Sequence, residues 1–251
     1  MPDPLPIEPD WDFYLCRIDD RPASVFTDLA NPRRGADPEL DTLYAVLLAM
    51  GEPGEHGMGT ADEAEVLFPV EDAVRDAAEE SGFRYVGRIR GSDRWQLCFM
   101  AAAGREPELD LLVHPAASAA PRSAEIRSMH DPDWSYVLGF LHPEAERLQW
   151  IMDRRVVEAL AREGDPLTTA REVRHWIGFS ALDASRRCSE QLTEQGFTCE
   201  EPQRDEGGNW SLLAHRKDPV DLQSIHEVVM LVIGAAEPFG GDYDGWETQV
   251  Q

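Results

Sequence analysis

Seven histidines are the residues of this sequence that most readily suggest acid–base or metal chemistry, because imidazole titrates near neutral pH and binds transition metals. None of them lies in an H-x-H, H-x-x-x-H or H-E-x-x-H pattern, the spacings that place two ligands on one element. His175 alternates with Val173 and Ile177, which indicates a hydrogen-bonded histidine on the inner face of a strand. We therefore predict neither a catalytic histidine nor a histidine-bound metal.

Carboxylates near the end of the chain are the other groups that could bind a cation. Asp242, Asp244 and Glu247 lie close together, and Asp-x-Asp-Gly resembles part of a calcium loop, but the twelve-residue spacing of an EF-hand is absent. The sequence also lacks a phosphate-binding glycine motif, a nucleophile elbow and a C-x-x-C pair among its four cysteines. It therefore predicts no catalytic residue, no cofactor and no metal, and cysteines that stay reduced.

These carboxylates belong to a segment dense in glycine and acid, Gly240 to Glu247, which predicts tight turns followed by a last strand. Trp246, Thr248 and Val250 would alternate onto one face of that strand. Because chain ends fray unless they are paired, we expect the strand to belong to a sheet.

The second half of the chain provides the elements of such a sheet. The expected elements are a strand at 171–179, a helix from Ser180 and Asp183, at capping-box spacing, to Gly196, strands at 197–201 and 209–215, a helix at 218–238 and the terminal strand. The order β-α-β-β-α-β is that of the ferredoxin-like fold. We expect a ferredoxin-like sandwich.

The first half predicts a mostly antiparallel sheet with one or two helices. Strands are expected at 11–18, 22–29, 83–90, 94–102 and 123–130, with loops at 51–59 and 116–121. The apolar run 40–50 is compatible with a strand or a helix, and its flanking glycines and prolines favour a buried strand. Thr60 and Glu63 have capping-box spacing and open a helix that ends at Gly82, with Pro69 expected to kink or restart it. The fold class is therefore α+β.

The domain boundaries follow from these patterns. We expect an α+β domain over residues 1–141, a connecting helix over 142–164 and a second domain over 165–251. The connecting helix has Pro143 in its first turn and carries an apolar side formed by Leu148, Ile151, Met152, Val156, Ala159 and Leu160.

The charge of the chain limits its partners. There are 48 acidic residues against 23 basic ones, a formal net charge of −25, and the only lysine is Lys217. Such a field repels nucleic acid and anionic membranes and favours basic proteins. The segment Met1 to Trp11 lacks the features of a signal peptide, and no apolar run is long enough to cross a bilayer. We expect a cytoplasmic protein that binds neither nucleic acid nor membrane directly.

A binding surface is expected on the second domain, because ferredoxin-like sheets leave one face open. Trp176 points to the face opposite His175, and large aromatic side chains beside acidic ones are candidates for partner contacts. The candidate protein-binding residues are His175, Trp176, Asp242, Tyr243, Asp244, Trp246 and Glu247.

The two halves resemble known bacterial families. The last 87 residues resemble the regulator of ribonuclease activity B family through Arg171, His175-Trp176 and the segment Gly240 to Thr248. The first half is similar to domain-of-unknown-function family 695. The points of similarity there are Trp11 to Tyr14, Glu71-Asp72, Tyr85-Val86-Gly87 and Asp131 to Trp134.

The first resemblance implies a non-enzymatic protein, since the named member of that family binds the essential endoribonuclease E and restrains RNA decay. Our first hypothesis is a regulator or adaptor that binds a protein partner, with a basic endoribonuclease as the candidate. The alternatives are an enzyme or small-ligand protein with a site between the two domains near His130, His142 or His175, and an immunity-like protein that neutralises a basic toxin. The oligomeric state is left open by the sequence.

Overall fold

The computed structural model describes residues 7–120 and 122–251, and it divides the chain into two compact units, Met1–Glu144 and Ala145–Gln251. Each unit has its own sheet and its own hydrophobic core. The α+β class with mainly antiparallel pairing, predicted from the sequence, is confirmed.

The first unit contains a six-stranded antiparallel sheet of order β1-β2-β4-β5-β3-β6. Its strands are β1 (Trp11–Ile18), β2 (Arg21–Asp28), β3 (Thr42–Ala49), β4 (Arg84–Gly91), β5 (Arg94–Ala101) and β6 (Ala124–His130). The two hairpins turn at Asp19-Asp20 and Ser92-Asp93, all four with positive φ, a conformation that short polar residues tolerate better than most. The predicted strands of this half are therefore confirmed.

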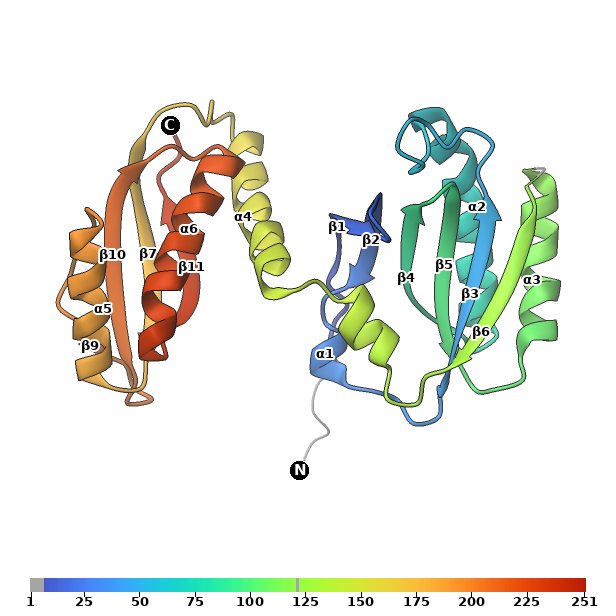
Figure 1. The fold of residues 1–251 in the computed structure, drawn as a ribbon, viewed down its shortest axis with the longest axis horizontal. Coiled ribbons are helices and arrows are strands. Elements are labelled where there is room, and N and C mark those ends of the chain that lie inside the picture. Colours follow the sequence, from blue (N-terminus) through green and yellow to red (C-terminus); the bar gives the residue numbers. More distant parts are fainter. Residues whose placement is uncertain (1–6, 121) are drawn as a thin grey trace. The chain divides into compact units, whose positions relative to one another are not determined.

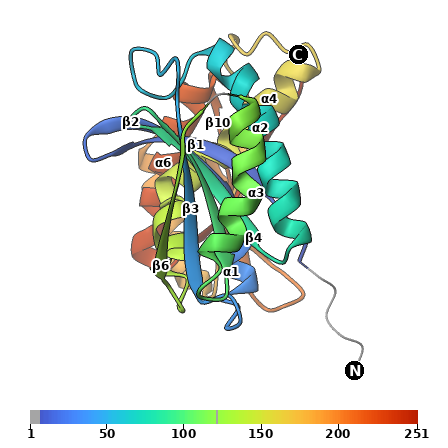
Figure 2. The ribbon, with the colours of Figure 1, turned by 90° about the vertical axis from the view of Figure 1, so that its right-hand side faces the viewer.

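The helices of the first unit are α1 (Asn31–Arg34), α2 (Ala61–Glu80) and α3 (Glu106–Ala119), with a π-helical turn η1 at Tyr136–Leu141. Figure 2 shows α2 and α3 side by side along one face of the sheet. The core lies between these helices and the inner strand face, where Tyr44, Leu67, Val74, Trp95 and Phe99 are buried. This burial supplies the main stabilisation of the unit.

One expectation for this unit was wrong, and a second was wrong in part. Residues 116–119 belong to α3 rather than to a loop, because alanine is the strongest helix former and Val113 and Ala117 continue the buried stripe that begins at Leu109; Pro121 lies outside the described residues. Helix α2 runs without interruption across Pro69, so it does not restart there.

The opening of α2 follows the expected capping pattern in part. The Thr60 hydroxyl accepts a hydrogen bond from the Glu63 amide at 3.1 Å. The Glu63 carboxylate does not reach back to Thr60, because it accepts from the amides of Gly51 and Glu52 and pairs with Arg122 at 2.9 Å. The buried Glu63 therefore ties the loop before α2 to the segment before β6.

The second unit consists of nine elements, shown in Figure 1. They are α4 (Ala145–Arg162), β7 (Arg171–Phe179), α5 (Leu182–Glu194), β8 (Thr198–Cys199), β9 (Gln203–Arg204), β10 (Trp210–Asp218), α6 (Leu222–Ala236), η2 (Glu237–Phe239) and β11 (Asp242–Thr248). The antiparallel order β11-β7-β10-β8 places the fourth main strand beside the first and the third between the first and second. This is the ferredoxin-like order, as predicted.

The helices of this unit pack on one face of its sheet. Inward residues of β7 meet Cys188 and Leu192 of α5 and Ile225, Val229 and Val232 of α6 in one buried cluster. Helix α4 contributes Val157 and Leu160 to the same cluster and contacts α6, so it belongs to the second unit.

Helix capping in this unit differs from the expectation at one helix. Ala181 is the N-cap of α5 and makes no side-chain cap hydrogen bond, so the predicted capping box of Ser180 and Asp183 was wrong. At α6 the Asp221 carboxylate accepts from the Ser224 amide at 3.1 Å and fixes the start of the helix. Among the described residues, the helices are too short or too polar for any of them to cross a bilayer.

Candidate functional site

Strand β7 places neighbouring residues on opposite faces of the second sheet. Its burial alternates strictly from Arg171 to Ile177, as the period of two in a strand requires. His175 is therefore fully buried against the helices, and Trp176 is 37% exposed on the open face. The two side chains lie on opposite faces of the sheet, as the alternation in the sequence predicts.

Strand β11 pairs with β7 along the edge of the sheet and contains a β-bulge. Tyr243 is opposite Ile177, Gly245 is opposite Trp176 and Trp246 is opposite His175, so Asp244 is an extra residue. Gly245 has a φ of +131°, which side-chain-bearing residues rarely adopt. Because of the extra residue, Tyr243 and Trp246 both face the helices although they are three positions apart.

A buried carboxylate connects α4 to the rest of the unit. Asp153 is fully buried; its Oδ1 accepts hydrogen bonds from Trp246 Nε1 at 3.0 Å and Gln149 Nε2 at 2.8 Å. Its Oδ2 lies 2.7 Å from His226 Nδ1 on α6. One side chain thus joins α4, α6 and β11, and it fixes the position of α4 beside the edge strand.

His175 and Tyr243 form a second buried contact next to this network. The Nδ1 atom of His175 lies 2.9 Å from the Tyr243 hydroxyl oxygen, and its Nε2 has no hydrogen-bond partner among the described residues. Burial lowers the pKa of His175 to about 4, so the ring is neutral at physiological pH. Burial, with a smaller effect of the Asp153 charge, raises the pKa of Tyr243. His175 and Tyr243 therefore contribute to the packing of the core, which is a structural role.

A groove of about 490 Å³ runs along the edge strand, with β11 as one wall and α4 as the other. We call it the α4–β11 groove. Its lining residues are Gln149, Met152, Asp153, Arg155, Val156, Trp176, Tyr243, Asp244, Gly245, Trp246 and Glu247. Carboxylates outnumber the single arginine, and the surrounding chain adds to the imbalance, since residues 218–251 contain seven acidic residues and no lysine or arginine.

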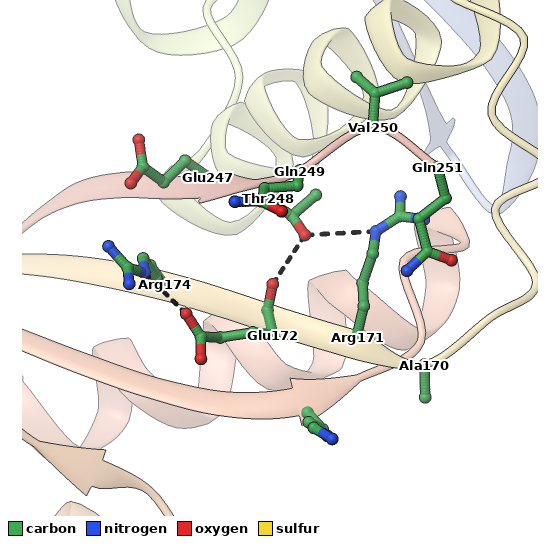
Figure 3. A pocket seen from close by; sticks show the side chains of 10 residues that line it. Ala170, Arg171, Glu172, Arg174, Glu247, Thr248, Gln249, Val250 and Gln251 are labelled. Atoms are coloured by element: carbon green, nitrogen blue, oxygen red, sulfur yellow. Dashed lines mark hydrogen bonds and ion pairs between the residues drawn. The ribbon is translucent and has the colours of Figure 1, made fainter.

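A second depression lies where β7 begins and β11 ends, near the last residues of the chain (Figure 3). The Thr248 hydroxyl donates to the Glu172 carbonyl at 2.7 Å and accepts from Arg171 Nε at 3.2 Å. Arg171 also pairs with Asp165, and Arg174 pairs with Glu172, both at 2.8 Å. Because both of its arginines are paired with acidic side chains, this depression is a weaker binding candidate than the groove.

The structure separates the predicted binding residues into two sets. Trp176, Asp242, Asp244 and Glu247 are exposed on the surface. His175 and Trp246 are buried and Tyr243 is half-buried, so these three form the support beneath them. Val250 lies beyond β11 and is 52% exposed, so the expectation that it shares a strand face with Trp246 was wrong.

Sequence reasoning missed Asp153 and His226, which hold the groove wall in place. The buried residues of α4 are Ile151, Asp153, Val157 and Leu160. Ala159, expected on the apolar side, is exposed. The spacing of Asp153 with Val157 and Leu160, four and then three residues, is that of one helix face and would have indicated a buried carboxylate.

The histidines considered for an enzymatic alternative lie in different environments. The side chain of His130 is 68% exposed, with its Nδ1 4.0 Å from Asp41 Oδ2, and His142 is half-buried. Across residues 7–120 and 122–251, histidine, cysteine and acidic side chains form no group of three that could hold a metal ion.

Comparisons with known proteins agree with the division into two units. A family model described as regulator of ribonuclease activity B matches residues 150–248, from α4 through β11. A model described as a family of unknown function, DUF695, matches residues 9–142. No curated protein matches the chain.

Two solved structures show only distant likeness. A putative glycine cleavage system transcriptional repressor is 7% identical, with 83% of this chain and 98% of that chain covered and a TM-score of 0.25. An unknown protein from Galdieria sulphuraria is 12% identical, with 84% and 100% covered and a TM-score of 0.23. Such low scores carry no argument. By its family matches, the chain belongs to the DUF695 family and continues into a region of the regulator of ribonuclease activity B type.

Proposed function

We propose that the protein is a non-enzymatic regulator whose second unit binds a basic protein partner, with an endoribonuclease of RNA decay as the candidate. The observation that carries this proposal is the α4–β11 groove, where an exposed tryptophan lies among carboxylates. The match to the regulator of ribonuclease activity B family supports it, because the matched residues 150–248 include every residue that lines the groove except Gln149.

Electrostatics favours a basic partner over a neutral one. The second unit contains 20 acidic and 11 basic residues, and Asp242, Asp244 and Glu247 are exposed on the edge strand. Complementary charge speeds association and selects the partner, while aromatic side chains provide most of the contact energy. Ribonucleases expose basic surfaces to bind RNA, and these surfaces would fit the acidic edge.

The test uses the purified full-length protein and the purified endoribonuclease E of the same organism. We expect saturable binding that weakens at high salt, and slower cleavage of a single-stranded RNA when the protein is added. Replacing Asp242→Asn, Asp244→Asn and Glu247→Gln together should lower the affinity about tenfold. A matched control changes Asp183→Asn and Glu190→Gln on α5, which are exposed but lie outside the groove.

Two results would contradict the proposal. Binding that is equally strong in the triple variant and in the wild type would exclude the acidic edge as the contact. An unchanged RNA cleavage rate at saturating protein would exclude regulation of this ribonuclease.

A further inference from the structure

The surroundings of Trp176 leave two sides of its indole without side chains. Its cross-strand neighbour on β11 is Gly245. Its next neighbour on the same face of β7, two residues further along the strand, is Gly178. A Cβ atom at Gly245 would meet no atom within 4 Å, and one at Gly178 would meet only the Asp242 carbonyl and Asp244 Oδ2, at 3.7 and 3.8 Å. The glycines thus keep space open beside an exposed aromatic ring.

Carboxylates border this space. Asp244 and Glu247 line the groove together with Trp176. Among the described residues, the side-chain carboxylates of Asp242 and Asp244 make no hydrogen bond or ion pair, and the nearby Arg174 is paired with Glu172 at 2.8 Å. An aromatic face with such carboxylates beside it is complementary to a cation.

We propose that the α4–β11 groove recognises an arginine side chain of the partner, with its guanidinium stacked on Trp176 and its N–H groups donating to Asp244 and Glu247. The inference rests on the proposed function and specifies the chemistry of the partner at that same groove. Here a segment of the partner presents the arginine, and the space beside Gly178 and Gly245 accommodates it.

The groove favours arginine over lysine for physical reasons. Its walls include the apolar side chains of Met152, Val156 and Trp246. A guanidinium is planar, is weakly hydrated and can donate two parallel hydrogen bonds to a carboxylate, whereas an ammonium is a strongly hydrated point charge. The stacking contact and the apolar walls should therefore give an arginine side chain a higher affinity for the groove than a lysine side chain.

The test is an NMR titration of the ¹⁵N-labelled full-length protein with three capped peptides, Gly-Ser-Gly-X-Gly-Ser-Gly, where X is arginine, lysine or citrulline. The indole N–H signal of Trp176, assigned by its loss in Trp176→Leu, should shift saturably with the arginine peptide. The affinity should be about threefold higher than for the lysine peptide and at least tenfold higher than for the uncharged citrulline peptide.

Variants locate the contact. Trp176→Leu keeps an apolar side chain on the strand but removes the ring, so it should abolish the preference for arginine over lysine. Asp244→Asn and Glu247→Gln should each weaken arginine binding about threefold. Glu190→Gln, an exposed acid of α5, and Leu231→Ala, 37% exposed on α6, serve as controls and should change nothing.

Three outcomes overturn the inference: a Trp176 signal that does not move, equal affinity for the arginine and lysine peptides, or a preference for arginine that persists in Trp176→Leu. The ribonuclease experiment separates this inference from the proposed function. Normal ribonuclease binding by Trp176→Leu would overturn the arginine site and leave the regulator intact. Arginine binding as described, without ribonuclease binding, would overturn the regulator alone.

Discussion

His175 and Trp176 are adjacent in the chain and have opposite environments. The strand alternation buries His175 completely, while more than a third of Trp176 is exposed. The buried imidazole has Tyr243 as its hydrogen-bond partner, and Phe197 packs edge-on against it. Desolvation is therefore the largest influence on its pKa. The charge of Asp218 raises this pKa by a smaller amount, and the charge of Arg216 lowers it.

This burial predicts that His175 makes the protein less stable in acid. Its pKa is about 4 in the folded protein, below the value of about 6.5 for an exposed histidine, so the unfolded chain binds the proton more readily between these pH values. The contribution is fully present above pH ~6.5 and is lost as the pH falls towards 4, by up to about 3 kcal/mol. Urea unfolding at pH 7 and pH 5 measures it.

The matched variant for this prediction is His175→Phe, which keeps a ring of similar size and cannot titrate. Its free energy of unfolding should fall less between pH 7 and pH 5 than that of the wild type. Parallel losses in the two proteins would show that His175 does not contribute to the pH dependence.

At the scale of elements, α4 is a structural part of the second unit. Its Val157 and Leu160 join the core, and Asp153 joins it to α6 and β11 through His226 and Trp246. A buried carboxylate with three hydrogen-bond partners is costly to disrupt, because the partners remain buried and unpaired. The α4 wall of the groove therefore depends on one side chain.

Replacing Asp153→Ala should lower the free energy of unfolding by about 3 kcal/mol, since the Trp246 indole N–H and the His226 ring both lose their partner. Asp153→Asn keeps one acceptor oxygen and should cost less. Glu158→Ala, exposed on the same helix, is the control and should cost only a few tenths. If Asp153→Ala unfolds with the same midpoint as Glu158→Ala, the connection is not a source of stability.

At the scale of the whole molecule, the two units have separate cores, and both carry a net negative charge. The formal charge of −25 is divided as −16 in residues 1–144 and −9 in residues 145–251. Each core is built from residues of its own unit. The units are therefore expected to fold independently.

A fragment of residues 145–251 should fold and unfold cooperatively, whereas a fragment of residues 165–251 should be markedly less stable. The shorter fragment lacks α4 and with it Val157, Leu160 and the acceptor for Trp246 Nε1. Thermal unfolding followed by circular dichroism compares the two. A shorter fragment as stable as the longer one would show that α4 only connects the units.

Residue patterns along the chain were enough to predict the local structure of the second unit and much of that of the first. The alternation of apolar and polar residues identified β7, and apolar residues at helical spacing identified α6. The order β-α-β-β-α-β predicted the strand order that the structure contains. These signals are local, because they depend on which residues recur at the spacing of one strand or one helix. The α3 helix was missed because its prolines and alanines resemble a loop.

Which candidate residues reach the surface depends on how distant segments pack together. The bulge at Asp244 turns Tyr243 and Trp246 inward together, and the Asp153 contacts turn a polar residue of α4 into the core. Both depend on pairing between segments distant in the chain, which residue spacing does not encode. The groove arises from the same long-range packing, because its two walls are about 90 residues apart in sequence and meet only when α4 packs beside β11.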